Sequence, residues 1–310
     1  MVLVLDGGST SVLDYVSETE KTDLMSSPLW TSQALFSCPA AVEKLYEAYV
    51  NAGAQLISCM TYQQSNLTMK HVKDNPEAYD LGMRTALQSC GTSGGKVSAV
   101  LTLGTHAAML ANGAEYSHVY HDEDRATLKD FHTERLSKFS SMPSWAQVQY
   151  MAFETLPDVL EAEIILDVLD ELKDKLSLSV KRTWISFSCS GEGAINKVLA
   201  GVQRLLKHNK IDLLWGVGIN CFKENMAGVV APFCDLLAEK QLYAVIYRDA
   251  GPQWDPVRRV FVGETMSPLA WAERAAADAK YNGGSVVIGG CCQTTPQHIA
   301  ALQACLCSQT

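Results

Sequence analysis

Residues 284–306 read GSVVIGGCCQTTPQHIAALQACL and contain one complete strand–loop–helix unit. The run 285–289 is apolar and rich in β-branched residues, which is typical of a strand buried on both faces. Cys291 and Cys292 stand where this strand ends, and Pro296 follows at a position typical of a first helical turn. A buried strand followed by a helix is the building unit of parallel α/β folds.

The same unit recurs along the whole chain. Short apolar runs predict eight strands, at 2–5, 55–60, 97–103, 148–153, 183–188, 213–219, 242–247 and 285–289. Longer amphipathic segments between and after them predict helices at 39–53, 76–90, 122–141, 157–176, 192–208, 224–240, 267–282 and 296–307. Eight such units predict an α/β protein with a (β/α)8 TIM barrel, although an open doubly wound sheet has the same alternation. No linker interrupts the pattern, so we expect a single domain over residues 1–310.

Composition and charge restrict the class of protein. The chain is 47% hydrophobic and 19% charged, as expected for a globular fold. A net charge of −9 without a basic cluster argues against binding to nucleic acid or to an anionic membrane. Neither a signal peptide nor a membrane span is predicted, and ten cysteines in such a chain indicate the cytoplasm. A monomer is favoured, because no long C-terminal extension offers a dimer arm.

Catalytic residues of a TIM barrel lie at the carboxyl ends of its strands. The predicted strand ends of this chain carry carboxylates, amides, hydroxyls and thiols. The candidates taken from these positions are Asp6, Gly7, Thr61, Tyr62, Gln63, Glu154, Asn220, Cys221, Tyr247, Cys291 and Cys292.

Three of these candidates are cysteines that would border one barrel mouth. Their spacing alone allows core packing, a metal site or a disulfide between Cys291 and Cys292, and the disulfide is disfavoured by strain and by a reducing compartment. The strand-end position of all three favours a metal. Three protein ligands and one open position are typical of catalytic zinc. Zinc held by thiolates alone is a mild Lewis acid, better suited to a soft substrate thiol than to water.

Six motifs occur along the chain in a recognisable order. They are LDGG at 5–8, NAGAQ at 51–55, TYQ at 61–63, FETLPD at 153–158, GINC at 218–221 and GGCCQTTPQHI at 289–299. Together they resemble the homocysteine S-methyltransferase family, of the S-methylmethionine- and betaine-dependent type. The resemblance spans nearly the whole chain and implies a (β/α)8 barrel.

The resemblance also implies roles for individual residues. Zn²⁺ would be held by Cys221, Cys291 and Cys292, and the sulfur of homocysteine would take the open position. Asp6 and Glu154 would be the catalytic carboxylates, acting as anchors for the substrate's amino group. The other strand-end residues, Gly7, Thr61, Tyr62, Gln63 and Asn220, would complete the substrate pocket.

A cationic methyl donor favours an aromatic face. Trp30 matches a tryptophan of the family, in the loop after the first strand, and Tyr62 and Tyr247 follow strands. We therefore expect these three aromatic residues to contact the donor, although each of them alone is compatible with simple packing.

The predicted reaction is zinc-dependent methyl transfer from a sulfonium, S-methylmethionine or S-adenosylmethionine, to the thiolate of L-homocysteine, which gives methionine. The chain departs from the family pattern on the donor side, where Val12 replaces a glutamate and residues 247–251 read YRDAG instead of YPNSG. These departures leave the donor open. The alternatives are a diverged, non-catalytic barrel that binds thiols or zinc, and a methyltransferase for a related thiol or selenol. A zinc hydrolase is disfavoured, because the chain has no H-E-x-x-H motif.

Overall fold

The computed structural model describes residues 1–72, 75, 77–116, 124–190, 193–255, 258, 260–281, 283 and 285–308. Within this part of the chain, eight parallel strands form one sheet in the order β1-β10-β7-β6-β5-β4-β3-β2. Their bounds are β1 Val2–Val4, β2 Leu56–Ser58, β3 Ser98–Gly104, β4 Tyr150–Leu156, β5 Arg182–Ser188, β6 Gly216–Phe222, β7 Tyr243–Arg248 and β10 Val286–Gly290. Each of the eight predicted strands is present.

The two edge strands of this order, β1 and β2, close the sheet. Leu5 forms a parallel bridge with Leu56. The amide of Gln55 donates to the carbonyl of Val4 at 2.7 Å, and that of Asp6 donates to the carbonyl of Leu56 at 3.0 Å. The fold is therefore a closed (β/α)8 barrel, and the open doubly wound alternative is wrong.

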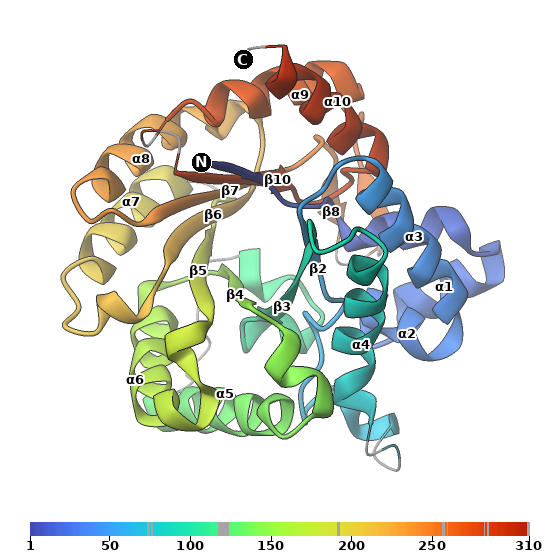
Figure 1. Cartoon of the computed structure of the whole chain (residues 1–310), viewed down its shortest axis with the longest axis horizontal. Coiled ribbons are helices and arrows are strands. Elements are labelled where there is room, and N and C mark those ends of the chain that lie inside the picture. The colour runs from blue at the N-terminus through green and yellow to red at the C-terminus, as the bar shows by residue number, and fades with distance from the viewer. Residues whose placement is uncertain are drawn as a thin grey trace.

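Helices surround the strands on the outside (Figure 1). The helices that follow the barrel strands are α3 Pro39–Asn51, α4 Ala78–Gly91, α5 Arg125–Ser140, α6 Val159–Leu176, α7 Ala194–Leu205, α8 Val230–Ala238, α9 Pro268–Asp278 and α10 Pro296–Cys307. All eight predicted helices are found, although the predicted starts at 76, 122–123 and 192 lie outside the described residues. The described chain contains no helix that combines the length and apolarity needed to cross a membrane.

Local chemistry explains why these helices begin where they do. Pro39 and Pro296 occupy the first turns of α3 and α10, where a missing N–H costs nothing. Asp158 caps α6, and its side chain accepts a hydrogen bond from the amide of Leu160 at 2.6 Å. The apolar stripe of α3 then packs Val42 and Leu45 against the sheet.

Alternate residues of the strands face two separate cores. In β7, Ala244 and Ile246 belong to the large core between sheet and helices. Val245 and Tyr247 belong to the smaller core inside the barrel, together with Trp184 of β5. This alternation directs Tyr247 into the barrel and lets the residues after each strand meet at one mouth.

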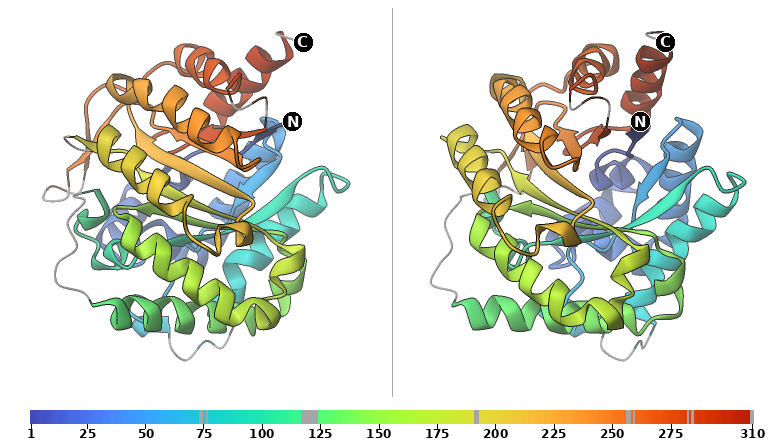
Figure 2. Two further views of the ribbon diagram at one scale, coloured as in Figure 1. Left: turned by 90° about the vertical axis from the view of Figure 1, so that its left-hand side faces the viewer. Right: turned by 60° about the vertical axis from the view of Figure 1, so that its left-hand side comes forward.

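Two insertions lie outside the predicted strand–helix pattern. Between β1 and α3 the chain forms α1 Glu18–Ser26, the short α2 Ala34–Ser37, and 3₁₀ helices η1 Ser9–Tyr15 and η2 Trp30–Gln33. After β7, strands β8 Gln253–Asp255 and β9 Val260–Val262 form an antiparallel pair. In Figure 1, α1 lies at the right of the view, beyond α3 and away from the strands. Figure 2 turns the opposite side of the barrel forward, so that α6, α7 and α8 lie in front of the strands.

The remaining short helices are 3₁₀ turns, most of them in connections between elements. They are η3 Met69–Val72, η4 Ala107–Leu110, η5 Ala114–Tyr116, η6 Pro143–Gln147, η7 Leu178–Val180, η8 Ile211–Leu213 and η9 Glu224–Val229. Two of these turns, η9 and η5, differ from what the sequence predicts. The helix predicted over 224–240 begins as η9 and becomes α-helical only at Val230, and η5 brings Glu115 and Tyr116 to the barrel mouth.

Candidate active site

Three cysteines converge at the carboxyl end of the barrel. Cys221 lies in β6, and Cys291 and Cys292 follow β10; the sulfurs of Cys221 and Cys291 are 3.0 Å apart. A carboxylate oxygen of Asp249 joins them, and the four potential ligand atoms lie within 4.8 Å of one another. A tetrahedral zinc ion with Zn–S bonds near 2.3 Å holds its sulfurs about 3.8 Å apart. The size and the chemistry of this cluster therefore fit such an ion.

The three thiols share their protons unequally. Hydrogen bonds from Cys221 and then from Cys291 lower the pKa of Cys292 to about 6. The same contacts raise the pKa of Cys221 well above its ordinary value. The hydrogen bonds within the cluster thus favour the thiolate form of Cys292, which is the form that binds a metal.

Backbone irregularities aim the side chains of β6 and β4 into this mouth. The register of β6 shifts between Asn220 and Phe222, and Cys221 between them has φ +55°. The register of β4 shifts between Phe153 and Leu156, and Thr155 has φ +66°. Left-handed conformations at such residues cost energy and occur mainly where function requires them. Bulges of this kind re-aim side chains next to active sites.

Asn220 joins the two irregular strands and contacts the cluster. Its amide nitrogen donates to the hydroxyl of Thr155 at 2.8 Å and to the sulfur of Cys221 at 3.1 Å. Its carbonyl oxygen accepts from the amide of Thr155 at 3.1 Å and from the hydroxyl of Ser186 at 2.9 Å. The Asn220 side chain is therefore fully engaged, and it positions Cys221.

The DGG turn and the cysteine loop are packed against each other. The amide of Gly8 donates to the hydroxyl of Thr294 at 2.9 Å, and this hydroxyl donates to the carbonyl of Cys291 at 2.6 Å. A Cβ atom at Gly8 would lie 2.5 Å from the same Cys291 carbonyl oxygen. No residue larger than glycine fits there without moving the cysteine loop.

This contact predicts the result of a Gly8→Ala substitution. The added methyl group must displace the Cys291 carbonyl, and overpacking of this kind costs about 1–3 kcal/mol. We expect zinc affinity to fall by about 10-fold or more, because outer-shell support sets ligand geometry. A competition titration against a chromophoric zinc chelator measures the change.

Gly91→Ala is the matched control for this substitution. A Cβ atom at Gly91 meets nothing within 4 Å, so zinc affinity should stay at the wild-type value. Wild-type zinc affinity in Gly8→Ala would contradict the proposed support of the cysteine loop by the DGG turn.

Two carboxylates lie at the same mouth. Asp6 is 3% exposed, and Ser58 donates to it through its amide at 2.8 Å and its hydroxyl at 2.7 Å. Burial raises the pKa of Asp6 to about 7, although the bonds from Ser58 oppose the shift. Burial, and then the negative charges of Cys291 and Asp6, raise the pKa of Glu154 well above its ordinary value. A bound ammonium group would relieve this repulsion.

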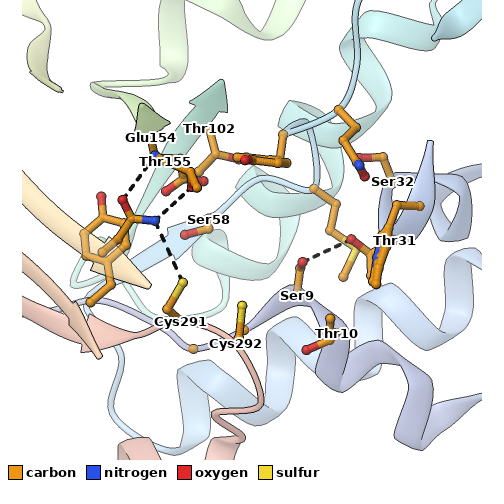
Figure 3. Close-up of a pocket in the computed structure, with 18 of the residues that line it drawn as sticks. Ser9, Thr10, Thr31, Ser32, Ser58, Thr102, Glu154, Thr155, Cys291 and Cys292 are labelled. Atoms are coloured by element: carbon orange, nitrogen blue, oxygen red, sulfur yellow. Dashed lines mark hydrogen bonds between the residues drawn. The ribbon is translucent and has the colours of Figure 1, made fainter. Parts of the chain in front are cut away.

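The mouth opens into one pocket that contains most of the predicted site residues. Gly7, Trp30, Tyr62, Gln63, Asn220 and Tyr247 all line it, together with the two carboxylates and the three cysteines. Tyr247 accepts a hydrogen bond from the indole of Trp184. In Figure 3, Cys291 and Cys292 lie side by side, and the hydroxyl-bearing Thr31 and Ser32 lie across from Glu154 and Thr155.

Thr61 is the exception among the predicted substrate contacts. Its side chain is fully buried, its hydroxyl donates to the carbonyl of Thr102 at 2.8 Å, and it is absent from the pocket lining. The structure therefore assigns Thr61 a supporting contact behind the pocket in place of a substrate contact.

Several residues of the site escaped sequence reasoning. Asp249 was visible only as a departure from the family's YPNSG pattern, although its place directly after a strand was a usable signal. Glu115 and Tyr116 line the pocket from η5, and Phe261 lines it from β9. Their approach depends on insertions that strand–helix periodicity does not predict.

Comparison with known proteins identifies the family of this chain. The family model described as homocysteine S-methyltransferase matches residues 3–306. The chain belongs to the homocysteine S-methyltransferase family. It is thus a member of a methyltransferase family, as the six motifs predicted.

Several named proteins are similar to this chain over most of their lengths. Homocysteine S-methyltransferase 2 of Zea mays is 28% identical over 324 residues, which cover 98% of this chain and 89% of that protein. Selenocysteine Se-methyltransferase of Brassica oleracea var. italica is 28% identical over 337 residues, with coverages of 99% and 89%. The metallated form of the homocysteine methyltransferase MmuM from Escherichia coli has a TM-score of 0.71 at 21% identity, with coverages of 98% and 96%. This structural likeness agrees with the barrel fold.

Proposed function

We propose that the protein transfers a methyl group from a sulfonium donor to the thiolate of L-homocysteine, in a zinc-dependent reaction that gives methionine. The observation that carries this proposal is the meeting of three cysteine thiols at the barrel mouth, in a chain of the homocysteine S-methyltransferase family. The donors we consider are S-methylmethionine and S-adenosylmethionine.

Cys221, Cys291 and Cys292 are the residues that would hold zinc, and Asp249 is within reach as a fourth group. A bound zinc ion supplies the positive charge that keeps a substrate thiol ionised near neutral pH. The sulfur-rich donor set supports zinc over magnesium or calcium, which prefer oxygen ligands. Asn220 holds Cys221 in place through its hydrogen bond to the sulfur.

Asp6 and Glu154 would bind the ammonium group of homocysteine. Each is a carboxylate at the mouth whose ionised form is disfavoured by burial, so a neighbouring cation stabilises both. Ser58 fixes both oxygens of Asp6 and so fixes the direction in which the substrate chain enters. The two carboxylates anchor and orient the substrate, and neither carries a proton in the reaction.

The chemical step is a displacement at carbon. The thiolate sulfur of homocysteine forms a bond to the donor methyl group while the bond from that methyl to the donor sulfur breaks and leaves a neutral thioether. No general base is needed at the methyl carbon. The contribution of the protein is alignment, where effective molarity is worth about 7–11 kcal/mol.

A related acceptor is the second candidate, because one named relative is a selenocysteine Se-methyltransferase. Cysteine and selenocysteine are shorter than homocysteine by one methylene, and a pocket distinguishes one methylene by only about 1–3 kcal/mol. The acceptor must therefore be determined directly.

The deciding experiment is a donor and acceptor panel with zinc-loaded protein. S-methylmethionine, S-adenosylmethionine and betaine are each supplied with homocysteine, cysteine or selenocysteine, and mass spectrometry measures the methylated product. We expect methionine from homocysteine with at least one sulfonium donor. Methylation of cysteine or selenocysteine alone would reassign the acceptor, and no product with any pair would exclude the enzyme in favour of a non-catalytic binder.

Three further properties remain predictions of the sequence. We place the protein in the cytoplasm, because sulfurs 3.0 Å apart would oxidise in a compartment that favours disulfides. A single domain over 1–310 and a monomeric state are also expected, and sedimentation velocity tests the monomer.

A further inference from the structure

The active-site pocket is rich in carboxyl groups, and none of its described lining residues has a cationic side chain. Asp6, Glu115 and Glu154 all line it, and no lysine, arginine or histidine is among the described residues that do so. An anionic group of a ligand would have no cationic side chain to bind among these residues. The pocket therefore favours ligands that bring positive charge.

Glu115 stands apart from the other two carboxylates. It lies in η5, is 7% exposed, and its Oε2 accepts no hydrogen bond from any residue the structure describes. Asp6, by contrast, accepts two bonds from Ser58. The backbone amide of Glu115 donates to its own carboxylate, which leaves Oε2 as a buried oxygen without a partner among the described residues. Such an atom is costly to bury and calls for an explanation.

The surroundings of Glu115 connect it to the reacting atoms. Burial raises the pKa of the phenol groups of Tyr62 and Tyr116, and the charge of Glu115 adds to the shift of both. The phenol of Tyr116 in turn hydrogen bonds to Cys292, a contact that lowers the pKa of that thiol. Glu115 is thus linked to the sulfur cluster through a single residue, Tyr116. The element that carries Glu115, η5, differs from the elements that carry Asp6 and Glu154.

We propose that Glu115 binds the positive charge of the methyl donor and that, with the aromatic face of Tyr62, it selects a sulfonium. This inference rests on the proposed methyl transfer. The donor cation must approach the acceptor sulfur at the cysteine cluster, and Glu115 and Tyr62 are an anionic and an aromatic residue of the pocket that contains this cluster. Transfer of the methyl group converts the sulfonium into a neutral thioether, which loses this attraction and leaves.

The carboxyl-rich lining of the pocket should also distinguish methyl donors by their net charge. S-methylmethionine and S-adenosylmethionine each carry a net charge of +1 in their usual zwitterionic form. Betaine is neutral overall, and its carboxylate would enter a pocket with no cationic lining residue. We therefore infer that donors with net positive charge bind better than betaine.

Isothermal titration with two ligands of the same shape tests the role of Glu115. S-methyl-L-methionine carries the sulfonium, and L-2-amino-5-methylhexanoic acid replaces its S⁺ by an uncharged CH group. Zinc-loaded wild-type protein should bind the sulfonium about 10-fold or more tightly than its neutral counterpart. Glu115→Gln should remove most of that preference while binding the neutral ligand as wild type does.

Two further measurements separate this role from a structural one. Glu115→Gln should keep its zinc content and unfold at or above the wild-type temperature, because it replaces a buried carboxylate by a neutral amide. Glu134→Gln, an exposed carboxylate of α5, is the matched control and should keep the full preference.

An unchanged sulfonium preference in Glu115→Gln, in a protein that is folded and zinc-loaded, would overturn the inference, as would a wild type without any preference. Because binding is measured without turnover, the result is independent of whether methionine is formed. Absence of product with an intact Glu115-dependent preference would instead count against the proposed reaction alone.

Discussion

Replacing Cys292 by alanine should leave the protein without stoichiometric zinc and reduce methionine formation to background. The substitution removes one of three sulfurs that meet at the barrel mouth, and among the described residues Asp249 is the one other group of that cluster. It also removes the thiol whose pKa is lowered to about 6 by its two neighbours, so the apo cluster loses its readily ionised sulfur. Loss of a direct ligand should exceed the roughly 10- to 100-fold effect on affinity of losing an outer-shell partner.

Cys234→Ala is the matched control for this result. Cys234 is a buried thiol of α8 that packs in the large core, outside the pocket lining. The Cys234→Ala variant should keep its full zinc content. The small cavity left by the substitution should cost only about 1–2 kcal/mol of stability. The zinc-to-protein ratio from plasma mass spectrometry, measured beside the melting temperature, distinguishes the two variants. Full zinc content in a folded Cys292→Ala protein would refute the assignment of Cys292 as a ligand.

The barrel could be predicted from the sequence because its strands are parallel and covered on both faces. Such strands appear as short apolar runs, and the helices between them begin at Pro39, Asp158 and Pro296. Helix α1 shows where this reasoning fails. Ser17 and Glu20 form a capping box that the sequence displays, but Leu24 is the helix's one buried residue among those described. Without an apolar stripe, periodicity gives no signal.

The candidate site was predictable to the extent that strand ends and cysteine motifs mark it. Cys221 and the Cys291–Cys292 pair are separated by 70 positions, and only the closure of the barrel brings their sulfurs together. Asp249 and Glu115 have ordinary sequence neighbours, and their importance comes from burial and from what they face. The bulge that turns Cys221 arises in the pairing of β6 with β7, which are distinct segments of the chain.

Arg135 is a residue whose importance only the structure reveals, and its replacement by methionine should strongly destabilise the fold. It lies on α5, is 1% exposed, and reaches between the loop after β2 and the end of β3. Its guanidinium donates to four backbone carbonyls, those of Thr61 at 3.1 Å, Tyr62 at 2.6 Å, Gln64 at 2.7 Å and Gly104 at 2.6 Å. Burial lowers the pKa of Arg135 to about 10, so it stays charged at neutral pH.

Methionine fills much of the volume of Arg135 but donates no hydrogen bond, so the four carbonyls lose this donor. The carbonyls of Thr61 and Tyr62 keep the backbone amides of Gln64 and Gly104 as donors, so the loss falls mainly on the carbonyls of Gln64 and Gly104. An unsatisfied buried acceptor costs about 1–3 kcal/mol, so we expect a total loss of about 2–6 kcal/mol. This is a large share of the roughly 5–15 kcal/mol that stabilises a typical protein. Urea denaturation followed by circular dichroism measures the loss.

Arg204→Met provides the contrast that identifies the cause. Arg204 also binds through two nitrogens, to Glu163 at 2.7 and 2.6 Å, but its side chain is 59% exposed. An exposed ion pair contributes about 0.2–1 kcal/mol, so its loss should change the urea concentration at the unfolding midpoint only slightly. Equal midpoints for the two variants would show that the four carbonyls find other donors. A much lower midpoint for Arg135→Met would establish that one buried cation, bound to backbone dipoles and not to a carboxylate, holds the loop that carries Tyr62 and Gln63 to the pocket.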